Sequence, residues 1–126
     1  MLPLLARSLG LARRRPDVAK ALPVLFSRRS HEFTHVGLRA LKLAADKKHA
    51  LGFLLELAGE VAGDQRLATL AEALVDHRVH RLQPFFIGAV SRRAAKPGFA
   101  LAKKWGFSME LDAAAFRDLY RKVARP

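Results

Sequence analysis

The sequence contains no cysteine among its 126 residues. This absence excludes a disulfide framework, catalysis by a thiolate, and any zinc or iron–sulfur site with cysteine ligands. It also fits a reducing compartment, and we expect a cytoplasmic protein. Long apolar runs are absent too, because the longest apolar stretch, 50–62, is interrupted by Glu56 and Glu60. Since a membrane-spanning helix needs about 20 apolar residues, the sequence predicts no transmembrane segment.

Acidic residues are scarce: the chain has 23 lysines and arginines against 11 aspartates and glutamates, a formal net charge of +12. Residues 1–31 contain seven basic side chains and one acid, residues 83–126 contain nine and three, and residues 32–82 contain seven of each. The positive excess therefore lies at both ends of the chain. Net charge of this size favours polyanionic partners, namely nucleic acid, an anionic membrane surface or an acidic protein.

β-Branched residues are also few, and no run alternates between apolar and polar residues, so the sequence predicts no strands. Alanine and leucine dominate, and both favour helix. Caps and helix breakers indicate helices at about 3–14, 17–28, 31–45, 47–62, 64–82, 84–95, 99–105 and 113–124. Asp17, Asp46 and Asp64 are the expected N-caps of three of them, and Gly63 is an expected stop. We expect one all-α domain, residues 1–126, folded as a compact bundle of six to eight short helices.

The first sixteen residues have a composition of their own. They contain Arg7 and three consecutive arginines, 13–15, but no acid, and Leu5 and Leu9 lie on one helical stripe. Such a basic amphipathic segment resembles an organelle transit peptide, which would be detachable from the domain. We favour the alternative interpretation, in which this segment is the first helix of the domain.

Residues 31–35, His-Glu-Phe-Thr-His, match the H-E-x-x-H pattern of zinc hydrolases. Two histidines four residues apart on one helix face bind the metal, and the intervening glutamate activates the bound water. Glu60 and Asp64 follow 25 and 29 residues after His35. The pattern resembles that of the thermolysin-like zinc proteases, although it covers only these short motifs. The resemblance implies that His31, His35 and Glu60 are zinc ligands.

Several features favour a solvated histidine pair instead. On a helical wheel the two histidines lie away from the apolar stripe that contains Phe33 and Val36, whereas a catalytic zinc normally lies in a structured cleft. Arg28 and Arg29 are close in the sequence, and positive neighbours disfavour a dication. The zinc proteases of this pattern also hold substrate along a strand edge, and no strand is expected. We therefore assign no catalytic residue, metal or cofactor, and keep a zinc hydrolase as an alternative.

Residues 99–108, Phe-Ala-Leu-Ala-Lys-Lys-Trp-Gly-Phe-Ser, resemble the helix-turn-helix of DNA-binding proteins. In that motif a small residue, here Ala102, and a turn glycine, here Gly106, allow two helices to pack closely. Asp112 falls where the motif has a buried aliphatic residue. The alternative is an ordinary helical hairpin that places Trp105 in the core.

Two smaller patterns have both a functional and a structural interpretation. Glu72, Asp76 and His80 recur every four residues on the expected fifth helix, as in a metal or acid–base cluster. We favour a solvated face, because the leucines and valines of this segment form the opposite stripe. For Phe85 and Phe86, we expect one ring in the core and the other at the surface.

The basic clusters carry our leading functional hypothesis, which is nucleic-acid binding with weak sequence preference. Phosphate contacts would come from both chain ends, on one face formed when the termini pack together. The alternative is a protein-interaction module, such as an adaptor or an antitoxin-like protein, whose basic ends bind an acidic partner. The candidate nucleic-acid contacts are Arg13, Arg14, Arg15, Arg28, Arg29, Arg92, Arg93, Lys103, Lys104, Arg117, Arg121 and Lys122.

Overall fold

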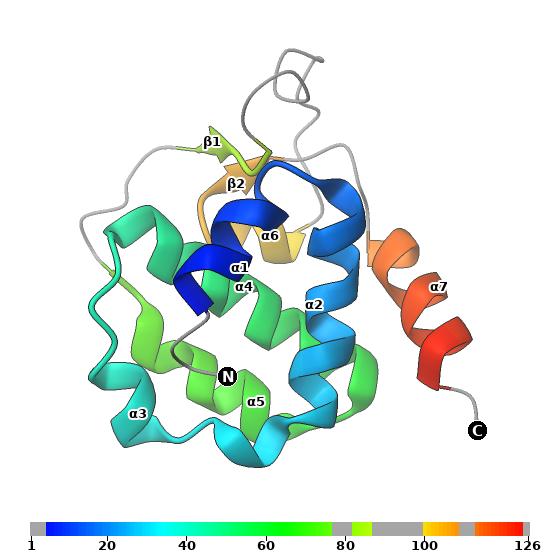
Figure 1. Cartoon of the computed structure of the whole chain (residues 1–126), viewed down its shortest axis with the longest axis horizontal. Coiled ribbons are helices and arrows are strands. Elements are labelled where there is room, and N and C mark those ends of the chain that lie inside the picture. Colours follow the sequence, from blue (N-terminus) through cyan, green and yellow to red (C-terminus); the bar gives the residue numbers. More distant parts are fainter. Residues whose placement is uncertain (1–4, 77–81, 87–99, 109–112, 125–126) are drawn as a thin grey trace.

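The computed structural model describes residues 5–76, 82–86, 100–108 and 113–124 (Figure 1). These segments form an assembly of short helices, which confirms the expected all-α fold. The helices are α1 (Leu5–Ala12), α2 (Pro16–Arg28), α3 (His35–Arg39), α4 (Ala45–Ala62), α5 (Gln65–Ala71), α6 (Ala100–Lys104) and α7 (Ala113–Ala124). Two 3-10 helices, η2 (Ser30–Glu32) and η3 (Glu72–Leu74), and two short strands, β1 (Gln83–Pro84) and β2 (Phe107–Ser108), complete the described elements.

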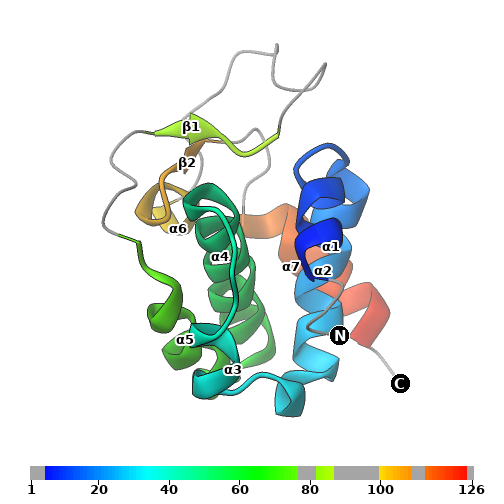
Figure 2. The ribbon, with the colours of Figure 1, turned by 60° about the vertical axis from the view of Figure 1, so that its left-hand side comes forward.

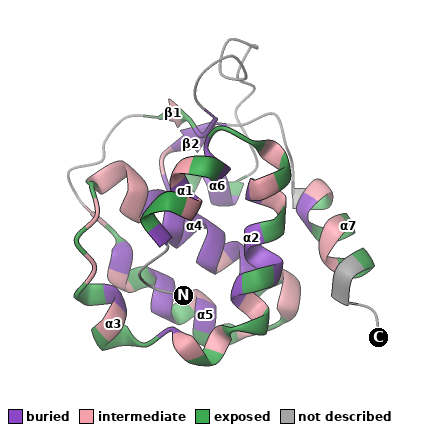
Figure 3. Cartoon of the chain, viewed as in Figure 1, coloured by how far each residue is buried: buried purple, intermediate pink, exposed green. Residues whose placement is uncertain are grey.

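Helix α4 forms the centre of the molecule. Its residues 49–59 are buried, apart from the half-buried Glu56, as expected for a helix with neighbours on several sides (Figure 3). Helices α1 and α2 pack on one side of α4, and α5 and α6 lie on the other (Figures 1 and 2). The helix ends at Gly63, whose φ of 69° lies in the left-handed region. The predicted stop at this glycine is therefore confirmed.

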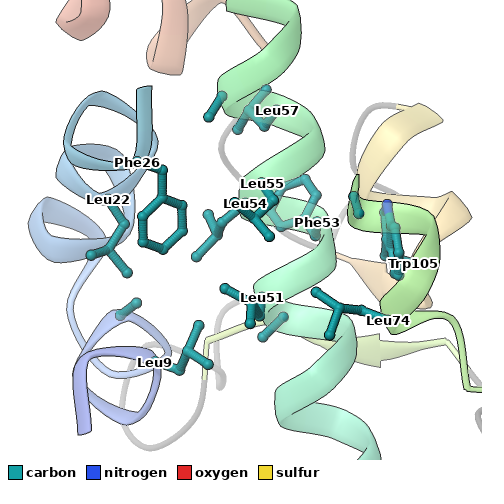
Figure 4. Packing of buried hydrophobic residues seen from close by; sticks show 14 of the residues in the cluster. Leu9, Leu22, Phe26, Leu51, Phe53, Leu54, Leu55, Leu57, Leu74 and Trp105 are labelled. Atoms are coloured by element: carbon teal, nitrogen blue, oxygen red, sulfur yellow. The ribbon is translucent and has the colours of Figure 1, made fainter. Parts of the chain in front are cut away.

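Two glycines allow other elements to approach α4 closely. A β-carbon at Gly52 would lie 2.4 Å from the indole ring of Trp105, which packs directly on α4 (Figure 4). A β-carbon at Gly59 would lie 2.8 Å from the carbonyl oxygen of Asp64 and 2.9 Å from the backbone nitrogen of Ala68. Any larger side chain at either position would require a neighbour to shift. These two contacts bring α6 and α5 against the central helix.

Phenylalanine rings connect α4 to the strands and to α7. The ring of Phe53 on α4 contacts Phe85 beside β1 and Phe116 on α7, with centroid distances of 5.6 and 6.2 Å. Phe85 also contacts Phe86 and Phe107, each at 5.1 Å, in edge-to-face geometry. Phe85 and Phe86 are both buried, so the expectation that one of them is at the surface is wrong.

Strands β1 and β2 pair in parallel, with Gln83 opposite Phe107 and Pro84 opposite Ser108. The expected helix beginning at Pro84 is therefore wrong at its start, and its remainder, 87–95, lies outside the described residues. A strand of two residues is too short to produce an alternating pattern, so the sequence predicts none.

The expected helix over 31–45 is interrupted. Phe33 is extended and fully buried, with its ring 5.2 Å from that of Phe26 on α2. Thr34 is the N-cap of α3, and its side chain accepts a hydrogen bond from the backbone nitrogen of Gly37. The chain therefore turns at residues 33–34 to bury an aromatic ring and starts a new helix with its own cap.

Other helix ends also differ from the prediction. The fifth helix ends at Ala71, and one 3-10 turn follows it, so it does not continue to Leu82. Asp64 caps this helix as predicted, because its side chain accepts from the backbone nitrogen of Arg66. The expected caps at Asp17 and Asp46 are wrong, since each lies one residue inside its helix. Among the described residues, no helix combines the length and apolar character that a membrane crossing requires.

Candidate nucleic-acid interface

The two histidines of the H-E-x-x-H pattern do not share a helix. His31 lies in η2, His35 is the first residue of α3, and the extended residues 33–34 separate them. The geometry that the zinc pattern requires, two histidines one turn apart on one helix face, is therefore not formed. Within the ranges that the structure describes, no group of three or more histidines and acids is placed to hold a metal ion.

The two acids that complete the zinc pattern have other surroundings. Asp64 accepts a hydrogen bond of 2.7 Å from the Ser30 hydroxyl in addition to capping α5. Arg66 donates to the backbone carbonyls of Ser30 and Phe33. These contacts fasten the turn after α2 to the turn between α4 and α5. Glu60 is exposed near the end of α4 and lines a cleft beside α7.

The patterns in residues 72–108 have mainly structural roles. Gly106 has a φ of 82°, and β2 follows it, so the second helix of a helix-turn-helix does not begin there. Trp105 lies in the core, as the alternative interpretation predicts. The cluster of Glu72, Asp76 and His80 does not form on one helix, because the helical turns end at Leu74 and His80 lies outside the described residues.

His49 is a buried histidine that holds two loops to α4. Its Nε2 accepts a 2.8 Å hydrogen bond from the backbone nitrogen of Asp76. The ring proton is therefore on Nδ1, which donates to the carbonyl oxygen of Trp105 at 3.0 Å. Both ring nitrogens are engaged by the backbone, so this histidine has a structural role.

Arg13 is the clearest correction among the candidate basic residues. Its side chain is buried, with Nε 2.9 Å from the carbonyl oxygen of Phe85 and one terminal nitrogen 2.7 Å from a carboxylate oxygen of Asp46. The other terminal nitrogen donates to the carbonyl of Pro84, and the guanidinium carbon lies 5.3 Å from the centre of the Phe107 ring. Arg13 therefore joins α1, the start of α4 and the strands, and its charge is not available to a phosphate.

Further candidates are paired with acids at the surface. Arg15 contacts Asp17 at 2.7 Å, and Arg29 contacts Glu32 at 3.2 Å. The hydrogen bond from Arg15 lowers the pKa of Asp17 below its ordinary value. Exposed pairs of this kind contribute little to stability, but they neutralise the arginine charge.

Lys104 is more firmly held. Its ammonium lies 2.7 Å from a carboxylate oxygen of Glu56 and 3.0 Å from one of Glu72. The hydrogen bond to Glu56, supported by Glu72, raises the pKa of Lys104 against the opposing effect of desolvation. The same oxygen of Glu56 accepts from the indole nitrogen of Trp105, so the cluster fixes α6 on α4.

The remaining candidates fall into three groups. Arg14 and Lys103 are exposed, on the α1–α2 connection and on α6. Arg92 and Arg93 lie outside the described residues. Arg28, at the end of α2, and three residues of α7 are exposed on a pair of helices that pack against each other (Figure 3). The three residues of α7 are Arg117, Arg121 and Lys122.

Two clefts lie beside α7, one between α2, the end of α4 and α7 and the other between α4 and α7. The larger, of about 370 Å³, is lined by Val24, Ser27, Arg28, Ala62, Asp64 and Tyr120. The smaller, of about 230 Å³, is lined by Glu60, Val61, Arg117, Tyr120 and Arg121. Tyr120 is half-buried and borders both. We call the surface formed by Arg28, Arg117, Tyr120 and Arg121 the α2–α7 surface.

The three arginines of this surface are among the nucleic-acid contacts that the sequence predicts, but Tyr120 is not. The tyrosine fits the apolar stripe of the last helix, so the pattern assigns it to the core. A signal is nevertheless present, because Tyr120 lies three residues after Arg117 and directly before Arg121, and side chains three and four residues apart share a helix face.

Searches against protein-family models, curated proteins and solved structures find no match to this chain.

Proposed function

We propose that the protein binds nucleic acid, with weak sequence preference, through the α2–α7 surface. The observation that carries the proposal is the packing of α7 against α2, at opposite ends of the sequence (Figure 2). Arg28 from the basic N-terminal part lines one cleft, Arg117 and Arg121 from the basic C-terminal part line another, and Tyr120 borders both. One arginine of the basic N-terminal part and two of the basic C-terminal part thus line clefts that share Tyr120.

The side chains at this surface suit a phosphate backbone. Arginine remains charged at any physiological pH, and its planar fork can donate two parallel hydrogen bonds to one phosphate. Arg117 and Arg121 are four residues apart on α7, so they lie side by side along the helix. Two adjacent exposed guanidinium groups can therefore contact neighbouring phosphates of one strand.

Acids at the clefts oppose this binding to different extents. Asp64 is engaged by Ser30 and by the backbone of α5, whereas Glu60 is exposed at the cleft that Arg117 and Arg121 line. Replacing Glu60 with glutamine should therefore strengthen binding, by about two- to five-fold for one exposed charge. A cytoplasmic location, expected from the absence of cysteine, would give the protein access to nucleic acid.

The first test is fluorescence anisotropy of a labelled random-sequence oligonucleotide at about 50 and 200 mM salt. We expect micromolar or tighter binding at low salt that falls steeply as salt increases, because binding to phosphates releases counterions. The variant Arg117→Ala/Arg121→Ala should weaken binding and reduce the slope of log affinity against log salt by about two.

The matched control is Arg39→Ala/Lys42→Ala. It removes the same charge from exposed positions at α3 and just after it, across the molecule from α7 (Figure 1). This control should lose much less affinity than the α7 variant. Equal losses would show that net charge alone drives binding and would refute the assignment to the α2–α7 surface. No binding at low salt would refute the function itself and leave an acidic protein as the partner to test.

A further inference from the structure

We infer that the α2–α7 surface binds single-stranded nucleic acid, with an unpaired base stacked on Tyr120. This inference rests on the proposed function and adds the class of nucleic acid that the surface selects. Its basis is the position of an aromatic side chain between arginines, at the junction of two clefts.

Tyr120 differs from the other large aromatic residues of the described segments. Seven phenylalanines and Trp105 are buried in the core, whereas Tyr120 is half-buried at the α2–α7 surface. A residue that lines two adjoining clefts presents part of its surface to each of them. One of these clefts is bordered by Arg28 and the other by Arg117 and Arg121. A base resting on the ring would therefore lie beside the cleft of Arg117 and Arg121, whose guanidinium groups can contact a flanking phosphate.

This combination favours unpaired strands over a duplex. In a duplex the base faces are covered by stacking, so a side-chain ring cannot reach them unless the helix opens. Proteins that bind single strands without sequence preference instead combine a positive groove with aromatic platforms, because every base has a face that can stack. Arginines beside the ring add phosphate contacts and can stack on bases themselves.

The shape of the surface agrees with this selection. The larger cleft, of about 370 Å³, falls within the range of roughly 300–1,000 Å³ that is typical of small-ligand sites. A cleft of this volume has room for part of an unpaired base beside the tyrosine. Val24 and Ala62 provide apolar surface in this cleft, next to the tyrosine.

Two substitutions at one position separate ring stacking from other effects. Tyr120→Phe keeps the ring, and Tyr120→Leu keeps an apolar side chain that favours helix but removes the ring. Anisotropy is measured with a labelled 12-nucleotide single strand, as DNA and as RNA, and with the duplex of the same sequence, at about 50 mM salt. Thermal unfolding of each variant confirms that the fold is retained.

We expect the wild type to bind both single strands more tightly than the duplex. Tyr120→Leu should lose about 5- to 150-fold in affinity for the single strands, the range for one stacked base, while duplex binding changes less than two-fold. Tyr120→Phe should stay within two-fold of the wild type on every probe. A single strand with abasic sites should bind the wild type about as weakly as the intact strand binds Tyr120→Leu.

The outcomes distinguish this inference from the function on which it rests. If Arg117→Ala/Arg121→Ala weakens all probes while Tyr120→Leu weakens none, the surface binds phosphates and the stacking inference is overturned. Equal affinity of the wild type for intact and abasic strands would overturn it as well. Absence of binding to every probe would refute the proposed function, and the inference with it.

Discussion

Replacing Arg13 with alanine should destabilise the protein strongly, although two exposed arginines follow it directly in the sequence. The buried guanidinium donates to the carbonyl oxygens of Phe85 and Pro84, to Asp46, and lies over aromatic rings. Phe85 is fully buried, so its carbonyl would lose a hydrogen bond that water cannot replace, at a cost of about 1–3 kcal/mol. The lost contact with the rings adds roughly 1–2 kcal/mol.

The other two partners add little, because the Asp46 side chain is 42% exposed and Pro84 is also exposed. The expected total is therefore about 2–5 kcal/mol, a large part of the 5–15 kcal/mol that stabilises a typical domain. In thermal unfolding this corresponds to a decrease in Tm of roughly 10–20 °C. Urea unfolding monitored by circular dichroism gives the free energy directly.

The control for this prediction is Arg14→Ala, which removes the same charge from an exposed neighbour. It should change the free energy of unfolding by no more than about 0.5 kcal/mol. If both variants unfold at the temperature of the wild type, Arg13 does not join the elements as described. Equal destabilisation by the two substitutions would also refute the reasoning, because only one of the two side chains is buried.

Two further predictions concern the contacts of Trp105. Gly52→Ala should cost about 1–3 kcal/mol, because its β-carbon would lie 2.4 Å from the indole ring, whereas Gly10→Ala, with open space, should stabilise α1 by about 0.5–1 kcal/mol. Thermal unfolding that moves both variants in the same direction would contradict this account of α4. His49→Ala should cost about 2–4 kcal/mol, because it removes the hydrogen bonds that its ring makes with the carbonyl of Trp105 and the backbone N–H of Asp76. Urea unfolding that shows a cost below 1 kcal/mol would argue against the structural role of this histidine.

The elements that sequence reasoning predicts well are those with local signals. The last helix, 113–124, has an amphipathic stripe and no competing cap, and its predicted bounds are confirmed. The ends of α4 and α6 are marked by Gly63 and Gly106, the two described glycines with positive φ. In each of these cases the residues that determine the element lie within one or two turns of it.

The failures have causes that are distant in the sequence. Ser30 and Thr34 are both good N-caps, and only the burial of Phe33 against Phe26 selects the second as the start of a helix. A loop follows the fifth helix. The backbone of this loop is held at Asp76 by His49, which lies 27 residues earlier in the sequence. Periodicity within a segment contains no information about such contacts.

The candidate site also combines features that have a local sequence signal with features that depend on distant contacts. Charge counting points to both ends of the chain, but it cannot distinguish Arg13, which faces inward, from Arg14, which faces solvent. That distinction depends on the carbonyl groups of the β1 region, more than 70 residues away. Tyr120 is assigned to the core by periodicity, because an aromatic residue on an apolar stripe looks the same whether its neighbours leave a cleft or fill it.

We propose that the packed helices α2 and α7 form the nucleic-acid surface. The most direct test is to record amide ¹H–¹⁵N NMR spectra of the 14.0 kDa protein during addition of an unlabelled single-stranded oligonucleotide. We predict that the largest shifts occur in α7 and in the last turns of α2, with little change in α3 and α6. Shifts centred on α3 or α6, or spread evenly over all exposed lysines and arginines, would contradict the account.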